Sequence, residues 1–213
     1  CSGIRFVIEM PKVNNLMTEN LTPEEYNRLE NLLDEEKDIQ AANLLRFALF
    51  TGMRRGELFK LKWKDINYNT KIILIRDPKS GLDETIPINE IALSVLDKHP
   101  KTESEFVFPG LGGNQRKTTP RPLRRVIKKA GLNNFRPFHG LRHAYASTLA
   151  SSGKVDLYKL QKLLTHKSPL MTQRYAHLSN DALMEASNVI SDLTKSHQNI
   201  TDLDELKIGK GES

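Results

Sequence analysis

Six side chains whose chemistry suits a phosphodiester are spread along the 213 residues of this chain. They are, in order, Arg54, Lys79, His139, Arg142, His166 and Tyr175. Guanidiniums and an ammonium can grip an anion, imidazoles can move protons, and a phenol can attack phosphorus. No carboxylate cluster or thiol group that would hold a catalytic metal accompanies them. The set therefore predicts covalent, metal-free strand chemistry on nucleic acid.

Arg54 and Arg142 are the residues expected to hold the phosphate. Arginine offers a planar fork of donors that matches two phosphate oxygens, and it stays charged at any working pH. Two such groups can bracket a phosphate and stabilise the charge that develops on its oxygens in the transition state. His139 precedes Arg142 by three residues at an expected helix start, so the two side chains project from one face.

Glu57 follows Arg54 by three residues, one helical turn further on. Its carboxylate can orient the Arg54 guanidinium, which would make Glu57 a supporting residue of the site. The same spacing fits an exposed ion pair within one helix, and such a pair contributes only about 0.2–0.5 kcal/mol. Both interpretations stay open on the sequence.

Tyr175 is the expected nucleophile. A free phenol has a pKa near 10, so only about one in a thousand is ionised at neutral pH, a handicap of roughly 4 kcal/mol that nearby cations or a base must offset. Tyr175 follows a run of polar residues, whereas the remaining tyrosines lie in stretches whose apolar residues predict packing roles. These are Tyr26, Tyr68, Tyr145 and Tyr158. Two further histidines, His143 and His177, are expected to be structural or exposed.

Three stretches of the chain resemble the boxes of the tyrosine recombinases, the phage-integrase family. Residues 51–58, TGMRRGEL, resemble its first-arginine box, and residues 139–143, HGLRH, its His-x-Leu-Arg-His box. Residues 164–168, LTHKS, with residues 172–175, TQRY, resemble the segment that carries the last histidine and the nucleophilic tyrosine. The resemblance runs from about residue 21 to residue 179, in the family's order and spacing, which makes it highly specific.

The resemblance assigns roles that the residue types alone do not. It implies that His139 accepts the proton of Tyr175, that His166 donates to a nonbridging phosphate oxygen, and that a lysine in a β-hairpin protonates the leaving 5′-oxygen. Lys79 fits that lysine, and Lys71 is the competing choice. Thr165 departs from the family, which usually has glycine before the last histidine, and a Cβ there could shift the backbone that carries His166.

A function follows from the resemblance. It implies a site-specific recombinase or integrase of a phage or mobile element, which cleaves double-stranded DNA through a 3′-phosphotyrosyl link and needs neither ATP nor a metal cofactor. Such enzymes are monomers when free and exchange strands as a homotetramer on DNA. Two alternatives are a type IB topoisomerase and a DNA-binding regulator with an inactive site. An apolar helical stripe at residues 182–193 fits either contact with a neighbouring subunit or packing on its own domain.

Composition fits a globular protein that works on DNA in the cytoplasm. Hydrophobic residues make up 38% and charged residues 27% of the chain, and we find no secretory segment and no apolar run long enough to cross a bilayer. The single cysteine, Cys1, excludes an intramolecular disulfide.

The net charge of +6 is concentrated in one basic stretch. Its cations are Arg116, Lys117, Arg121, Arg124, Arg125, Lys128 and Lys129, with no acidic residue between them. Such a stripe can neutralise phosphates and release counterions, although charge alone fits a solvated helix face equally well. Beside the six catalytic types, the DNA-binding interpretation is favoured.

The pattern predicts a mainly α fold with a small antiparallel β-sheet, the α+β class of the family's catalytic domain. Residues 1–20 are expected to be a linker from a missing N-terminal DNA-binding domain, residues 21–196 the catalytic domain, and residues 197–213 a flexible tail. A capping box at Thr22 starts the first helix, a second runs from Ile39 to Phe50, and a hairpin spans residues 71–88. Later helices are expected at residues 89–98, 121–130, 139–152, 156–165, 168–176 and 180–195.

Overall fold

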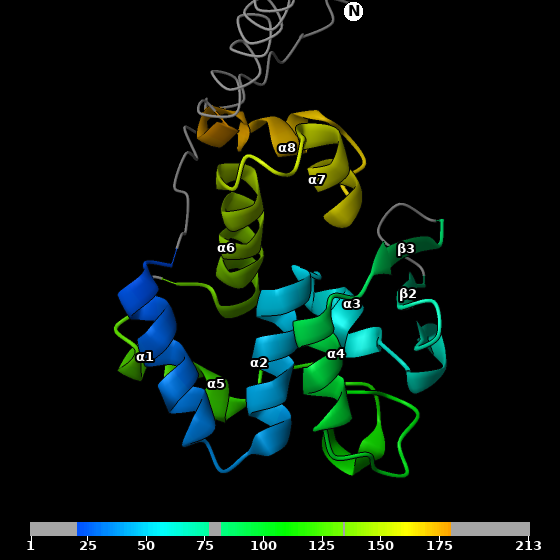
Figure 1. The fold of residues 1–213 in the computed structure, drawn as a ribbon. Helices are drawn as coiled ribbons and strands as arrows, with labels where there is room; N and C mark the ends of the chain where they lie inside the picture. The colour runs from blue at the N-terminus through cyan, green and yellow to red at the C-terminus, as the bar shows by residue number, and fades with distance from the viewer. Residues whose placement is uncertain (1–20, 77–81, 134, 180–213) are drawn as a thin grey trace, which may run out of the picture.

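The computed structural model describes residues 21–76, 82–133 and 135–179 (Figure 1). Its helices are α1 (Pro23–Asp34), α2 (Ile39–Thr51), α3 (Arg55–Lys60), α4 (Glu90–Asp97), α5 (Arg121–Lys129), α6 (Pro137–Ser151), α7 (Leu157–Leu163) and α8 (Leu170–Gln173), with 3-10 turns η1 (Trp63–Asp65), η2 (Leu111–Gly113) and η3 (Ala176–Ser179). The strands β1 (Ile66–Asn67), β2 (Ile72–Ile75) and β3 (Glu84–Pro87) form one antiparallel sheet. The predicted α+β class is confirmed. No helix in these ranges is long and apolar enough to cross a membrane.

Helix α2 is the centre around which the other helices pack. Asp38 caps it by accepting from the backbone N–H of Ala41, and nine of its 13 residues are buried. Helices α4, α5 and α6 pack against it, and α1 packs on α5 (Figure 1). Helix α1 begins as predicted, with Thr22 and Glu25 forming a reciprocal capping box. The largely buried helix α2 therefore supports the segment that carries Arg54.

A glycine fixes the end of α2. Gly52 has a φ of 63°, in the left-handed region that favours glycine, and its N–H donates to the carbonyl of Ala48 at 3.0 Å. A Cβ on Gly52 would lie only 2.4 Å from Cδ1 of Tyr145 on α6. The chain therefore turns sharply at Gly52, and Arg54 follows two residues later as the N-cap of α3.

The predicted hairpin is present, and the structure describes one of the two lysines considered as the acid for the leaving oxygen. In the sheet, β2 pairs with β3 so that Ile73 lies opposite Ile86, and β1 pairs with the other edge of β2. Both isoleucines are buried in the main core. Lys79 lies between β2 and β3 in the sequence, outside the described residues. Lys71 precedes β2 and forms an ion pair with Glu90 at 2.5 Å.

A second, smaller core lies between α6, α7 and the segment after α8. Its buried side chains are Ala146, Ala150, Leu160, Leu164 and Tyr175. In Figure 1 these helices form the upper part of the molecule, above the main core around α2. The polypeptide thus has two packed regions, and α6 contributes side chains to both of them.

The helix predicted at residues 168–176 is wrong in its extent. Helix α8 has four residues, Pro169 rather than Ser168 is its N-cap, and the chain turns so that the backbone N–H of Tyr175 donates to the carbonyl of Thr172 at 2.9 Å. The Tyr175 ring is 2% exposed and belongs to the second core, and burial of this large ring stabilises the turn that carries it. Helix α6 starts at Pro137, two residues earlier than predicted, since proline is accepted in a first turn. The predictions for residues 1–20 and 180–213 lie outside the described residues.

Replacing Gly52 by alanine tests this turn. Gly52→Ala should lower the free energy of unfolding by about 2–5 kcal/mol, because a left-handed φ costs roughly 1–2 kcal/mol and overlap with the Tyr145 ring roughly 1–3 kcal/mol. Urea unfolding measures the change. Gly56→Ala is the matched control: its Cβ would meet nothing within 4 Å, so stability should stay the same or rise by up to about 1 kcal/mol. Equal effects of the two changes would contradict this account.

Candidate active site

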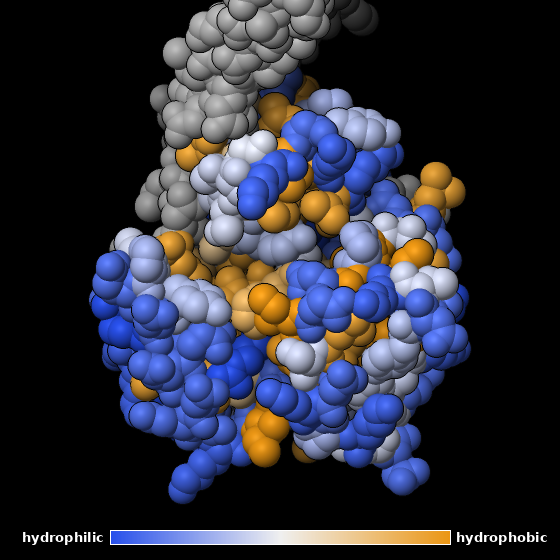
Figure 2. Space-filling view, viewed as in Figure 1, coloured by the Kyte–Doolittle hydropathy of each residue, from blue (hydrophilic) through white to orange (hydrophobic). Residues whose placement is uncertain are grey.

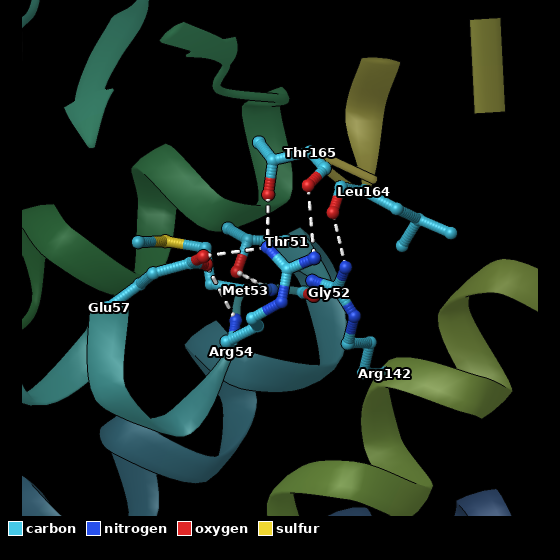
Figure 3. Close-up of polar contacts among 8 residues, drawn as sticks. All are labelled: Thr51, Gly52, Met53, Arg54, Glu57, Arg142, Leu164 and Thr165. Atoms are coloured by element: carbon cyan, nitrogen blue, oxygen red, sulfur yellow. Dashed lines mark hydrogen bonds and ion pairs between the residues drawn. The ribbon is translucent and has the colours of Figure 1, made fainter. Parts of the chain in front are cut away.

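Arg54 is held by a carboxylate on its own helix and by a residue distant in sequence (Figure 3). Its Nη1 donates to Oε1 of Glu57 at 2.8 Å and to the hydroxyl of Thr165 at 2.5 Å. Its Nη2 donates to the carbonyl of Thr165 at 2.9 Å, and Oε2 of Glu57 accepts from the backbone N–H of Arg54 at 2.8 Å. Glu57 therefore contacts Arg54 twice, which is the orienting arrangement rather than a solvated ion pair.

Thr165 adopts a left-handed backbone conformation, which glycine accommodates more easily than other residues do. Its φ is 48°, and a non-glycine residue there is strained by about 1–2 kcal/mol. The threonine hydroxyl offsets part of that strain through its charge-assisted hydrogen bond with Arg54. The Thr165 side chain thus adds a hydrogen bond to the Arg54 guanidinium, which glycine could not make.

Arg142 joins the end of α2 to the end of α7. It is 9% exposed, its Nη1 donates to the carbonyl of Gly52 at 2.7 Å, and its Nη2 donates to the carbonyl of Leu164. Burial, and then the neighbouring Arg54, lower the pKa of Arg142 to about 10, so the side chain stays charged at neutral pH. Arginine has five N–H donors, and within the described residues these two contacts leave others to meet an anion.

His166 lies beside the two arginines as a neutral imidazole. Burial first, and then Arg142 and Arg54, lower the pKa of His166 to about 3. Its Nδ1 is 2.8 Å from the hydroxyl of Thr172, a residue that is 1% exposed. When that hydroxyl donates to Nδ1, the proton of the ring is on Nε2, which can then donate to an oxygen of a bound anion.

The packing roles expected of Tyr26, Tyr68 and Tyr158 do not match the structure, because these side chains are 37%, 40% and 68% exposed. Tyr175, the expected nucleophile, is 2% exposed. Its ring fills the second core, although it follows the polar residues Gln173 and Arg174. Burial raises the pKa of the Tyr175 phenol above 10, even though Arg174 and Arg142 act in the opposite direction.

His143, which we expected to be structural or exposed, is the hydrogen-bond partner of the Tyr175 phenol. Oη of Tyr175 lies 2.5 Å from Nδ1 of His143, which is 5% exposed. Nε2 of His143 lies 2.9 Å from Nε2 of His139, one helical turn earlier on α6. The four-residue spacing of the two histidines is visible in the sequence, but nothing local connects it with a tyrosine 32 residues away. His177, by contrast, is not buried among the core residues.

Most of the predicted DNA-binding cations are on the surface. Lys117 is exposed, and so are five residues of α5, Arg121, Arg124, Arg125, Lys128 and Lys129. Arg116 differs, because it is half-buried and donates to the carbonyls of Phe108 and Pro109 and to Gln40. The folded chain also brings Glu36 to 2.9 Å from Arg125. Helix α2, which begins near Glu36 and ends near Arg54, is 13 residues long and so separates the stripe from the arginine pair by roughly 20 Å.

The polar site is distinct from the apolar hollow on the face shown in Figure 2. That hollow, of about 370 Å³, lies between α1, α2 and α6, and its lining includes Leu21, Tyr26, Phe50 and Tyr145. None of the five described side chains that we predicted to be catalytic lines it. No group of three or more metal-ligating side chains occurs in the part of the chain that the structure describes.

Comparisons with known proteins find a matching family model and several similar proteins. Residues 19–181 match the model of the phage integrase family. Tyrosine recombinase XerA of Pyrococcus horikoshii is 30% identical over 186 residues, which cover 84% of this chain and 64% of XerA. The integrase of Salmonella phage P22 is 30% identical over 202 residues, 88% of this chain and 51% of that protein.

A solved structure of XerA recombinase has a similar fold. It aligns with a TM-score of 0.64 and 27% identity over 78% of this chain and 63% of that one. The chain spans about half to two thirds of the length of the relatives just described.

The buried imidazole of His143 and the partly buried imidazole of His166 should make the folded state sensitive to acid. Burial is the main cause that lowers the pKa of His143 to about 4 and that of His166 to about 3, whereas an unfolded histidine has a pKa near 6.5. Between these values the unfolded chain binds more protons, so stability should fall as the pH drops below about 6.5, by up to about 1.4 kcal/mol per pH unit for each histidine. Urea unfolding across this pH range measures the slope.

Two variants test which histidine causes the dependence of stability on pH. His143→Asn should remove the contribution of one histidine, and His177→Asn, at a position outside both cores, should leave the slope unchanged. If wild type and His143→Asn lose stability equally with falling pH, His143 is not the neutral buried group described here.

Proposed function

This chain belongs to the phage integrase family, and on that premise we propose that it contains the catalytic domain of a site-specific DNA recombinase. It would cleave one DNA strand through Tyr175 and rejoin it to another, as in the integration or excision of a phage or mobile element. The observation that carries the proposal is the pair of adjacent guanidiniums, Arg54 and Arg142, fixed by backbone carbonyls beside a tyrosine and three histidines.

The arginine pair suits a phosphodiester because its charge and geometry are set before the substrate arrives. The Thr165 and Gly52 carbonyls orient one guanidinium each, so little side-chain entropy remains to be lost on binding. In the transition state the phosphorus carries extra negative charge on its equatorial oxygens, and the remaining N–H donors can stabilise that charge. Neutral His166 supplies a further donor through Nε2.

The reaction itself exchanges one ester for another. As the bond from Oη of Tyr175 to phosphorus forms, the bond from phosphorus to the 5′-oxygen breaks, and that oxygen takes a proton from an acid for which Lys79 is our proposal. Attack by the 5′-hydroxyl of another strand reverses the step. The protein–DNA ester conserves the bond energy, so the cycle needs no ATP.

The partners follow from the same chemistry. We propose double-stranded DNA with defined recombination sites as the substrate, a homotetramer as the form active on DNA, a monomer as the free form, and the cytoplasm of a bacterium as the location. We also propose that this chain binds DNA in a salt-sensitive way, because its exposed cations would neutralise phosphates.

A covalent adduct with DNA tests the proposal. Suicide substrates from the flanks of the genetic element, nicked so that the cleaved end cannot religate, should give a band on denaturing gels in EDTA, both with the full-length protein and more weakly with this chain. Tyr175→Phe should abolish the band. Arg142→Lys should reduce the rate by about 10²–10³-fold, because lysine cannot reach both carbonyls and the phosphate.

The matched control for the arginine change is Arg55→Lys, one residue after Arg54, exposed and stacked near Phe59. It should keep the wild-type rate. If the full-length protein forms no adduct on its own site, the chain is a DNA-binding regulator with a silent site. Relaxation of supercoiled DNA without defined sites would instead favour a type IB topoisomerase.

The basic stripe predicts how binding depends on salt. Arg124→Ala with Lys128→Ala removes two exposed cations one turn apart on α5, and each cation that no longer neutralises a phosphate should reduce the slope of log affinity against log salt by about 0.9. The control pair Lys64→Ala with Lys98→Ala removes the same charge from exposed positions elsewhere. Equal slopes for both doubles would show that the α5 stripe is only a solvated face.

A further inference from the structure

Three side chains form a hydrogen-bonded line from the buried phenol to the surface of α6. Tyr175 is buried, His143 lies between, and His139 is exposed. We propose that His143 is a catalytic residue that takes the proton of Tyr175 and passes it to His139 at the surface. This inference rests on the proposed function and adds to it a residue that the sequence had assigned no chemical role.

The geometry favours His143 over His139 as the group that receives the proton. Oη of Tyr175 is 2.5 Å from Nδ1 of His143, and the rings lie 5.8 Å apart between their centres. His139 meets the other side of the His143 ring, Nε2 to Nε2 at 2.9 Å, with the two rings nearly perpendicular at 77°. The role that the family resemblance gives to His139 can therefore be reached through His143.

The tautomers of such a line determine one another. When the phenol O–H donates to Nδ1 of His143, the neutral ring holds its proton on Nε2 and donates it to Nε2 of His139. Transfer then takes place in two coupled moves: the O–H bond of Tyr175 breaks as an N–H bond forms at Nδ1, and the Nε2–H bond of His143 breaks as one forms on His139. His143 ends neutral in the other tautomer, His139 ends cationic, and the phenolate oxygen attacks phosphorus.

The electrostatic surroundings of His143 explain why it would pass the proton on to His139. His143 is in a buried place that faces His139, Arg174, Arg136 and Arg142, and burial followed by these groups lowers the pKa of His143 to about 4. A lasting imidazolium there is unfavourable, whereas exposed His139 can be solvated as a cation. The phenol needs such a route, because its own burial raises its pKa.

The same contact could instead be a latch that keeps the phenol away from the DNA. The two interpretations differ in sign, since loss of a proton acceptor slows cleavage and loss of a latch speeds it. A general base is typically worth about 10²–10⁴-fold in rate. A change of that size in a single-turnover assay is easily measured.

The test combines His143→Asn with a more acidic nucleophile. Asparagine keeps a hydrogen-bond partner near Nδ1 but cannot accept a proton, so single-turnover cleavage of the suicide substrate by the full-length protein should slow by about 10²-fold or more. Trifluorotyrosine at position 175 loses its proton without help. With it, His143→Asn should cleave within about tenfold of the protein that keeps His143, because a base then contributes little of its usual 10²–10⁴-fold. His139→Gln, a change at an exposed position, should show the same rescue.

Each outcome either supports or overturns the proposed proton relay. If both variants are slowed equally with either phenol, the histidines are structural and the relay is overturned. Unchanged cleavage also overturns the relay, and faster cleavage identifies a latch instead. His139→Gln keeps the test valid if His143→Asn unfolds, because its side chain is outside both cores. Failure of the proposed function looks different, since unmodified wild type would then form no adduct at all.

Discussion

Three backbone carbonyl groups and one carboxylate hold two guanidiniums side by side, and the rest of the structure depends on this clamp. Arg142 donates to Gly52 and Leu164, and Arg54 donates to Thr165 and Glu57. Burial, and then repulsion by Arg54, lower the pKa of Arg142, so each cation needs protein acceptors that take the place of water. The same bonds connect the main core at the end of α2 to the second core at the end of α7.

These hydrogen bonds both hold the arginines and connect the two cores, which explains the left-handed backbone at both ends of the clamp. Gly52 and Thr165 have φ values of 63° and 48°, and each turn aims a carbonyl at an arginine. The cost of strain is local, whereas the benefit is a pair of charges that need no rearrangement when a phosphate arrives. The clamp thus provides a preorganised anion site, and the neighbouring core holds Tyr175 in a hydrogen-bonded line with His143 and His139.

Local signals were enough to predict much of the fold and part of the site. The capping box at Thr22, the glycine after α2, the hairpin and the Arg54–Glu57 contact involve residues within one or two turns or one hairpin of each other. The sequence did not reveal that Glu36 meets Arg125, that Thr165 meets Arg54, or that His143 meets Tyr175, at separations of 89, 111 and 32 residues. The residues around Tyr175 could not predict its burial, because the second core is assembled from α6, α7 and the turn after α8.

The central claim is that the clamped arginines are the place where DNA phosphate binds. A crystal structure of the Tyr175→Phe protein bound to its own recombination site tests this most directly, because the variant can bind DNA but cannot cleave it. The account predicts one phosphate with oxygens hydrogen-bonded to both Arg54 and Arg142, while Gly52, Leu164 and Thr165 keep their contacts to the two guanidiniums. DNA that contacts α5 but leaves no phosphate at the two guanidiniums would contradict it.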